Sequence, residues 1–185
     1  FFSKEEKNRI SNATAEAESK TIGEMAVMVV DKSSDYLEAE ILGGVFLSRL
    51  VSIILFDIFF HSSMWFFLLF AFILFFPSRI VFGRLPALIA LFLNRKRKEK
   101  AVRERALRAF YEKGLYRTKQ NTGVLFFLSL FERKVWVLTD KGIHGKIQQN
   151  TLNRLANLVS KGIRDGKACD SLVEAIKEAG EILAR

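Results

Sequence analysis

Residues 41–60 of this 185-residue chain read ILGGVFLSRLVSIILFDIFF, and residues 64–76 read MWFFLLFAFILFF. A helix needs about 20 predominantly apolar residues to cross the hydrocarbon core of a bilayer. The first run has that length, and the second reaches it by continuing past Pro77 to about residue 82. A three-residue connection between the runs leaves room for a tight turn only. We therefore expect a two-helix transmembrane hairpin at residues 41–82.

A hairpin returns the chain to the side of the membrane that it left, so its two flanks must meet there. We expect residues 1–40 and 101–185 to form one folded domain from two separated pieces. Residues 83–100 would connect the hairpin to the second piece as an interfacial, basic segment. The flanks favour an α/β (α+β) domain, in which helices surround a small sheet.

Positive charge follows the hairpin directly. Residues 95–108 read RKRKEKAVRERALR, and the whole chain carries a net charge of +9. Basic residues next to a membrane span mark the cytoplasmic side and attract anionic lipid headgroups. No aromatic side chains alternate with the basic block, which argues against nucleic acid as a partner. The side chains expected to contact headgroups are Arg49, Arg79, Arg95, Lys96, Arg97 and Lys98.

Two charged residues fall inside the first apolar run, and three explanations stay open for them. Arg49 lies level with about Phe75 of the second run, where no carboxylate is present, and Asp57 lies about 12 Å farther along the same helix. A charge inside a membrane is costly unless it reaches the interface or finds a partner. Arg49 can extend to lipid headgroups, pair with another chain, or serve transport.

Local patterns predict the elements of the flanks. Ser3 and Glu6 have the spacing of a capping box at the start of a helix. Pro77 and residues 83–86 should interrupt the second apolar helix, and Gly114 should end a later one. The lone Cys169 excludes a disulfide framework and fits a small buried residue near a helix start. The expected helices are 3–20, one from about 36 into the first span, 101–112, 150–165 and 168–184. Residues 87–93 are too short to cross the membrane again and would lie at the interface or pack against the soluble domain. The expected strands are 24–30, 123–130 and 134–139, with 123–130 central because it is apolar throughout.

Residues 116–145 read YRTKQNTGVLFFLSLFERKVWVLTDKGIHG. This stretch resembles the TPM domain, the family of thylakoid lumenal repair proteins, a nematode receptor accessory protein and many bacterial membrane-associated proteins. The variant here is similar to a bacterial subgroup whose TPM domain is interrupted by a membrane hairpin. The residues that carry the resemblance are Arg117, Thr118, Thr122, Gly123, Glu132, Arg133, Asp140, Gly142 and His144.

The resemblance implies a multi-pass protein of the bacterial inner (cytoplasmic) membrane. The basic block separately predicts that the soluble domain lies in the cytoplasm. It also implies a choice of functions, because family members include acid phosphatases, calcium-binding proteins and accessory factors. Members often occur beside LemA-type membrane proteins, which implies such a partner. Many members carry Asp-Asn-Gly where this chain has Asn121, Thr122 and Gly123, and the missing carboxylate weakens a metal or phosphatase role.

Asp140 and His144 are the candidates for binding a divalent cation such as calcium, because they lie four residues apart after one strand. Glu132 cannot join them, since it lies at the opposite end of that strand, about 25 Å away. The alternative is that Asp140 caps the following turn and His144 makes local hydrogen bonds.

The residues do not favour catalysis. No glycine-rich phosphate loop or closely spaced carboxylate pair is evident, and Ser129 and Cys169 have no base beside them in the sequence. We therefore expect a non-enzymatic, membrane-anchored interaction or accessory module. The alternative is a metal-dependent phosphatase. The sequence leaves self-association open.

Overall fold

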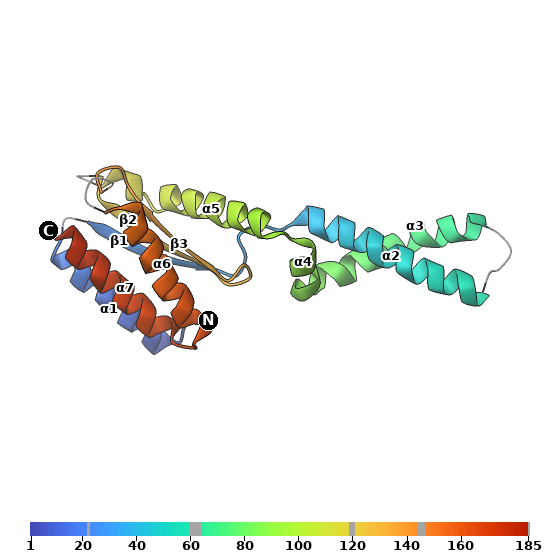
Figure 1. The fold of residues 1–185 in the computed structure, drawn as a ribbon, viewed down its shortest axis with the longest axis horizontal. Coiled ribbons are helices and arrows are strands. Elements are labelled where there is room, and N and C mark those ends of the chain that lie inside the picture. Colours follow the sequence, from blue (N-terminus) through green and yellow to red (C-terminus); the bar gives the residue numbers. More distant parts are fainter. Residues whose placement is uncertain (22, 60–63, 119–120, 144–146, 185) are drawn as a thin grey trace. The chain divides into compact units, whose positions relative to one another are not determined.

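The computed structural model describes all residues except 22, 60–63, 119–120, 144–146 and 185 (Figure 1). The chain divides into two compact units. Unit 1 comprises Phe1–Ser33 and Glu99–Arg185, and unit 2 comprises Ser34–Lys98. The two flanks of residues 34–98 thus form one unit. The turn expected between the two apolar runs, and His144, lie outside the described residues.

Unit 1 contains a three-stranded sheet in the order β1-β2-β3. β1 (Glu24–Val30) runs parallel to β2 (Gly123–Ser129), and β2 runs antiparallel to β3 (Lys134–Thr139). Every residue of β2 is buried. The prediction of a central strand covered on both faces is confirmed, because a continuous apolar run has no side that could face water.

The side chains of β2 alternate between two cores. Val124, Phe126 and Leu128 pack with three helices, α1 (Lys4–Ser19), α6 (Gln149–Arg164) and α7 (Ala168–Leu183). Leu125 and Phe127 pack on the opposite face with α5 (Arg95–Glu112) and the short η1 helix (Leu115–Arg117). Unit 1 is therefore a small sheet between layers of helices, as Figure 1 shows.

Sequence signals at the ends of these helices are confirmed. Ser3 accepts a hydrogen bond from the backbone of Glu6, and the Glu6 carboxylate accepts one from Ser3, which completes the predicted capping box. Gly114 follows α5 with φ +72°, a conformation that glycine adopts without strain. Cys169 is buried at the start of α7.

Unit 2 contains α2 (Leu37–Phe59), α3 (Met64–Arg84) and α4 (Pro86–Phe92), and α2 and α3 pack against each other. The predicted interruption at Pro77 is wrong, since α3 continues through it to Arg84. Proline removes one backbone hydrogen bond, and a long apolar helix beside a packed neighbour can retain its path despite that loss.

The basic segment is also more helical than predicted. α5 begins at Arg95 and not at 101. The side chain of Asn94 accepts a hydrogen bond of 2.7 Å from the backbone N–H of Arg97, which caps the helix there. The signal was an asparagine directly before a helix-favouring basic run.

Candidate functional site

The α2–α3 pair has small and polar residues at its interior. Ser48 and Ser52 of α2 and Ser78 of α3 are buried. A Cβ atom at Gly44 would lie 3.0 Å from the backbone of Arg79, so the two helices approach closely there. Small residues permit such close approach between two helices.

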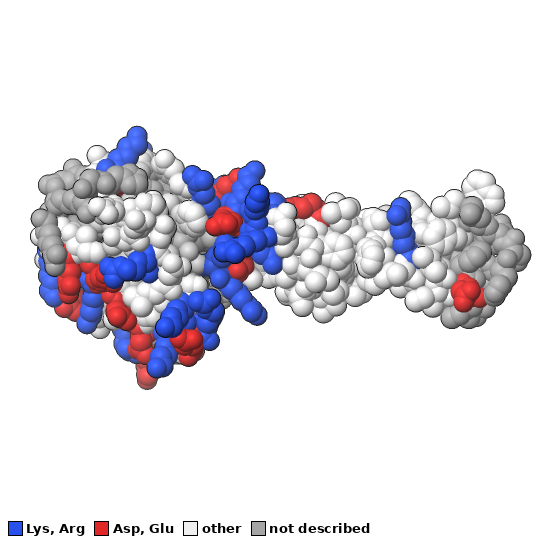
Figure 2. Space-filling view, viewed as in Figure 1, with Lys and Arg blue, Asp and Glu red and all other residues white. Residues whose placement is uncertain are grey.

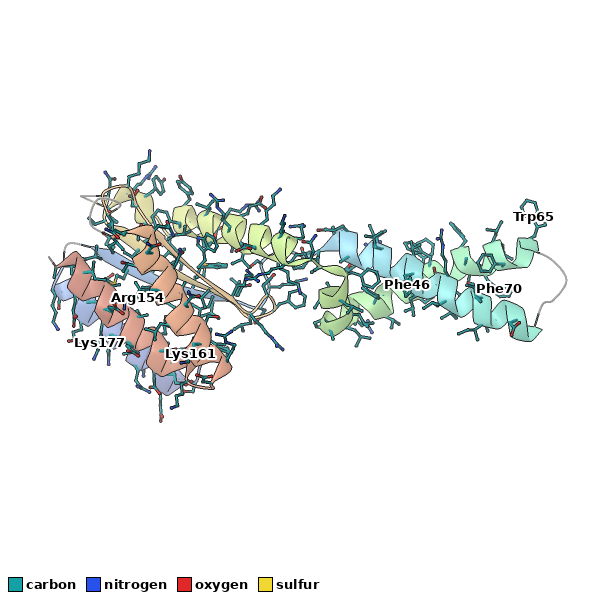
Figure 3. The ribbon with its side chains drawn as sticks, viewed as in Figure 1. Phe46, Trp65, Phe70, Arg154, Lys161 and Lys177 are labelled. Carbon is teal, nitrogen blue, oxygen red and sulfur yellow. The ribbon has the colours of Figure 1, made fainter. Side chains whose placement is uncertain are left out.

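The exterior of the same pair is strongly apolar. Trp65, Phe72 and Leu42 are 80%, 69% and 60% exposed. Figure 2 shows few charged atoms on the visible surface of these helices, and Figure 3 shows Trp65 projecting outward. The other large apolar side chains exposed on α2 and α3 are Leu37, Ile41, Phe46, Leu50, Ile53, Ile54, Leu68, Leu69, Ile73, Phe76, Ile80 and Val81. A water-soluble helix pair buries such side chains, so this distribution is inverted relative to a soluble fold.

One helix of the described residues, over Phe67–Arg84, is long and apolar enough to cross a membrane. Only 11% of that window is buried. This low burial separates it from the core helix of a soluble protein, although a single such helix is weak evidence of membrane association. That α2 and α3 each cross a membrane stays a prediction.

The charged residues of the helix pair face outward to different degrees. Arg49 and Asp57 are exposed on α2, and Arg79 is half-buried on α3. Gly44 contacts the backbone of Arg79, so Arg49 lies about 7 Å farther along the pair than Arg79. The structure thus places the two arginines at neighbouring levels of unit 2.

The four basic residues at the start of α5 divide into two kinds. Arg95 and Lys96 are exposed. The guanidinium of Arg97 donates to Glu38 Oε1 at 2.6 Å and lies 5.5 Å from the centre of the Tyr36 ring, both in unit 2. Sequence reasoning missed Glu38 as a partner because 59 positions separate the two residues.

Lys98 has an intramolecular contact as well. Its ammonium group donates to the backbone oxygen of Ala90 at 3.1 Å, at the end of α4. Arg97 and Lys98 therefore hold the start of α5 to α2 and α4 within unit 2. Of the four basic residues at the start of α5, Arg95 and Lys96 are the two whose side chains are exposed.

Several of the motif residues gather where β2 begins and β3 ends. The hydroxyl of Thr118 accepts from the backbone of Thr122 at 2.7 Å, and Gly142 donates to the Asn121 oxygen at 3.1 Å. Gly123 must lack a side chain, because a Cβ atom there would lie 2.3 Å from the Leu115 oxygen. These residues join two loops at one end of the sheet. Arg117 lies beside them, exposed and 5.2 Å from the centre of the Tyr116 ring.

Asp140 is the ionisable member of this group. Its Oδ1 accepts from the backbone of Lys141 at 2.7 Å, as expected of a residue that caps a turn. Its Oδ2 is buried and has no hydrogen-bond partner among the described residues. The described residues contain no group of three His, Cys, Asp or Glu side chains that could hold a metal ion. A metal site at Asp140 and His144 stays a prediction.

Glu132 lies at the other end of the sheet, in the turn between β2 and β3. It is 7% exposed, and its carboxylate accepts from the Ser33 backbone at 3.0 Å and from the Ser129 hydroxyl. Ser33 and Ser129 also share a hydrogen bond of 2.7 Å between their hydroxyls. This buried cluster ties the end of β1 to the β2–β3 turn. Arg133, next to it, is exposed with φ +51°.

Comparison with known proteins identifies the domain. A family model described as the TPM domain matches residues 88–182, slightly more than half of the chain. The NMR structure of the BA42 protein from the psychrophilic bacterium Bizionia argentinensis superposes with a TM-score of 0.57. That alignment has 19% identity and covers 100% of this chain and 82% of BA42, so it shows a shared fold alone. No curated protein matches the chain.

Proposed function

Because the chain belongs to the TPM domain family, we propose that it is a membrane-anchored interaction module, with unit 1 as the interacting domain. The observation that carries this proposal is the inverted helix pair, with buried serines inside and large apolar side chains outside. In this proposal α2 and α3 cross the membrane as a hairpin, and both sequence flanks of unit 1 lie on the cytoplasmic side.

The proposed lipid contacts follow from position and charge. Arg49 and Arg79 would extend along their helices to phosphate groups at the interface. Arg95 and Lys96 are exposed at the start of α5 and would contribute electrostatic attraction to anionic headgroups. Arg97 and Lys98 already bond to Glu38 and to the Ala90 oxygen. They would therefore attract headgroups through their positive charge and not through direct contact.

We propose an interaction role without catalysis. In this proposal Glu132 serves the fold, because its carboxylate accepts hydrogen bonds from the Ser33 backbone and the Ser129 hydroxyl. A LemA-type membrane protein of the bacterial inner membrane is the proposed partner. Co-purification of such a protein with the full chain in mild detergent supports this partner, and purification of the chain always alone contradicts it.

Alkaline carbonate extraction of membranes tests the anchoring. The full chain should stay in the membrane pellet. Substituting lysine at the exposed positions Leu69 and Phe72 should move it to the supernatant or prevent its accumulation, since each lysine costs about 2.5 to 3.5 kcal/mol at the centre of a membrane helix.

The matched control places two lysines at exposed apolar positions of unit 1, Leu107→Lys with Tyr111→Lys on α5. This variant should remain in the pellet, because the substituted positions already face water. A wild-type chain that carbonate releases would exclude membrane anchoring. A reporter fused after Arg185 should be active in the cytoplasm alone, and a signal from the periplasm would reverse the orientation.

A metal-dependent phosphatase is the second candidate. The buried Oδ2 of Asp140, unpartnered among the described residues, is the observation that favours it. In that case purified protein should release phosphate from a model ester when a divalent metal is supplied, and Asp140→Asn should abolish the release. No turnover across several metals and pH values would remove this candidate.

A further inference from the structure

The outer edge of β1 is open. β1 pairs with β2 on one side, where the Val30 oxygen accepts from the backbone of Leu130. On the other side the Met25 N–H donates to Glu18 at 2.8 Å. Backbone groups alternate in direction along a strand, so Val27 and Val29 direct their N–H and C=O groups to that outer side. No residue of the described ranges forms a hydrogen bond with these outward groups.

A groove of about 600 Å³ follows this edge between β1 and α1. Val27 and Val29 form part of its floor. Its α1 wall is a single stripe, because the residues recur at helical spacing: Lys7, Ile10, Ser11, Thr14, Ala15 and Glu18. Soluble edge strands are normally protected by lysine, proline or a bulge, and β1 has neither lysine nor proline. An apolar edge of this kind favours pairing with another strand.

The edge is complementary to itself. A two-fold axis through Val27 would place Val27 of two copies opposite each other, in antiparallel pairing, with Met25 opposite the partner's Val29. Glu18 contacts the start of β1, and Lys7 lines the same groove as Val29, so α1 runs antiparallel to β1. The same axis therefore brings Lys7 toward the partner's Glu18.

Distances along α1 and along β1 place the centres of both elements on the same two-fold axis. The midpoint between Lys7 and Glu18 lies about 8 Å along α1 from Glu18. Val27 lies about 7 Å along β1 from Met25, the residue that Glu18 contacts. The small side chains of Ser11 and Ala15 fall near this midpoint, where the two α1 helices would approach each other.

We propose that the β1–α1 edge is the interface of a symmetric homodimer, in which two three-stranded sheets join into one of six strands. Val27 and Val29 of each copy donate main-chain hydrogen bonds across the interface, and Met25 does not because Glu18 already accepts its N–H. Lys7 of each copy forms an ion pair with the partner's Glu18, so the symmetric interface contains this pair twice, once at each end. Every residue used lies in unit 1, so the dimer stands or fails separately from membrane anchoring.

Sedimentation of the full chain in detergent measures the dimer, with Lys7→Glu as the main variant. Reversal turns two attractions of the symmetric interface into two repulsions, so the dissociation constant should rise about tenfold or more. Lys4→Glu is the matched control, because Lys4 is an exposed lysine of the same helix outside the groove. Its dissociation constant should equal that of the wild type.

A zero-length carbodiimide cross-linker identifies the contact itself. Lys7 and Glu18 of one helix lie about 16 Å apart, beyond the reach of a direct amide bond. A Lys7–Glu18 cross-linked peptide in the dimer band therefore has to join two copies. Val27→Pro, which removes a donor at the axis, should also weaken the dimer while circular dichroism shows unit 1 still folded.

Three outcomes would overturn the proposal. The first is a chain that is monomeric at all concentrations. The second is a dimer that Lys7→Glu leaves unchanged and that yields no Lys7–Glu18 cross-link, because such a dimer forms elsewhere. The third is a chain whose β1 edge pairs with a different protein in place of a second copy.

Discussion

Glu132 is a carboxylate that serves the fold of unit 1. It is buried between two strands and accepts hydrogen bonds from the Ser33 backbone and the Ser129 hydroxyl. Removing it would leave the half-buried Ser33 N–H without its acceptor, and unpaired donors shielded from water are costly. The residue therefore joins β1 to the β2–β3 hairpin.

Glu132→Ala should lower the free energy of unfolding of unit 1 by about 2 to 4 kcal/mol. Urea unfolding followed by Trp136 fluorescence, in a Trp65→Phe background, measures this change because Trp136 lies in β3. Arg133→Ala, at the exposed neighbouring position, should change it by less than about 0.5 kcal/mol. Equal stability of the two variants would contradict a fastening role for Glu132.

Cys169 should be chemically inert in the folded chain. Burial raises the pKa of its thiol, so the thiolate fraction at neutral pH is smaller than for a free cysteine. The thiol is 3% exposed, and reagents reach it only when the chain opens locally. Alkylation by iodoacetamide should be about a hundredfold or more slower than in denaturant.

The control for this rate is Ser19→Cys in a Cys169→Ser background. Ser19 is exposed at the end of α1, and its cysteine should react at nearly the same rate with and without denaturant. Fast alkylation of native Cys169 would show that the start of α7 is open to solvent.

At the scale of elements, α2 and α3 depend on the glycines between them. A Cβ at Gly44 would lie 3.0 Å from the Arg79 backbone, which cannot move aside as a side chain can. Gly44→Leu should therefore destabilise the helix pair by about 1 to 3 kcal/mol. Titration of micelles with a denaturing detergent, followed by helical circular dichroism, measures that loss.

Leu50→Phe serves as the control for added volume on the same helix. Leu50 is 44% exposed, so the larger ring has space outside the pair. The midpoint of the detergent titration for Leu50→Phe should match that of the wild type. Loss of stability in both variants to the same degree would indicate that α2 and α3 do not pack through Gly44.

The elements that the sequence predicts correctly are those specified by local patterns. β2 is apolar on both faces, and α1 carries its own capping box, so neither depends on a distant residue for recognition. The bond between Arg97 and Glu38, and the burial of Glu132, depend on contacts across 59 and 99 positions. Patterns within a short stretch of sequence cannot predict contacts between residues so far apart in the chain. The interruption predicted at Pro77 is wrong because packing within the helix pair compensates for the hydrogen bond that proline removes.

At the scale of the whole molecule, residues 34–98 leave unit 1 and return to it at one end of its sheet. Ser33 donates to Glu132 at 3.0 Å, and Glu99, the first residue after the return, lies 3.6 Å from Lys134. Both contacts flank the β2–β3 turn. The parallel pairing of β1 with β2 needs a crossover connection, and α5 supplies one from residues within unit 1.

Unit 1 should therefore fold without residues 34–98. A Gly/Ser linker of about ten residues, spanning roughly 17 Å, should join Ser33 to Glu99 and give a protein that is soluble without detergent. Cooperative unfolding and dispersed amide resonances measure its folding. Removing residues 1–33 as well should abolish both, since β2 loses its parallel partner β1 and the α1 layer of its core. If the linked protein is molten or aggregated, unit 1 requires unit 2 for its stability, and the inserted segment is then part of the folding unit and not an addition to it.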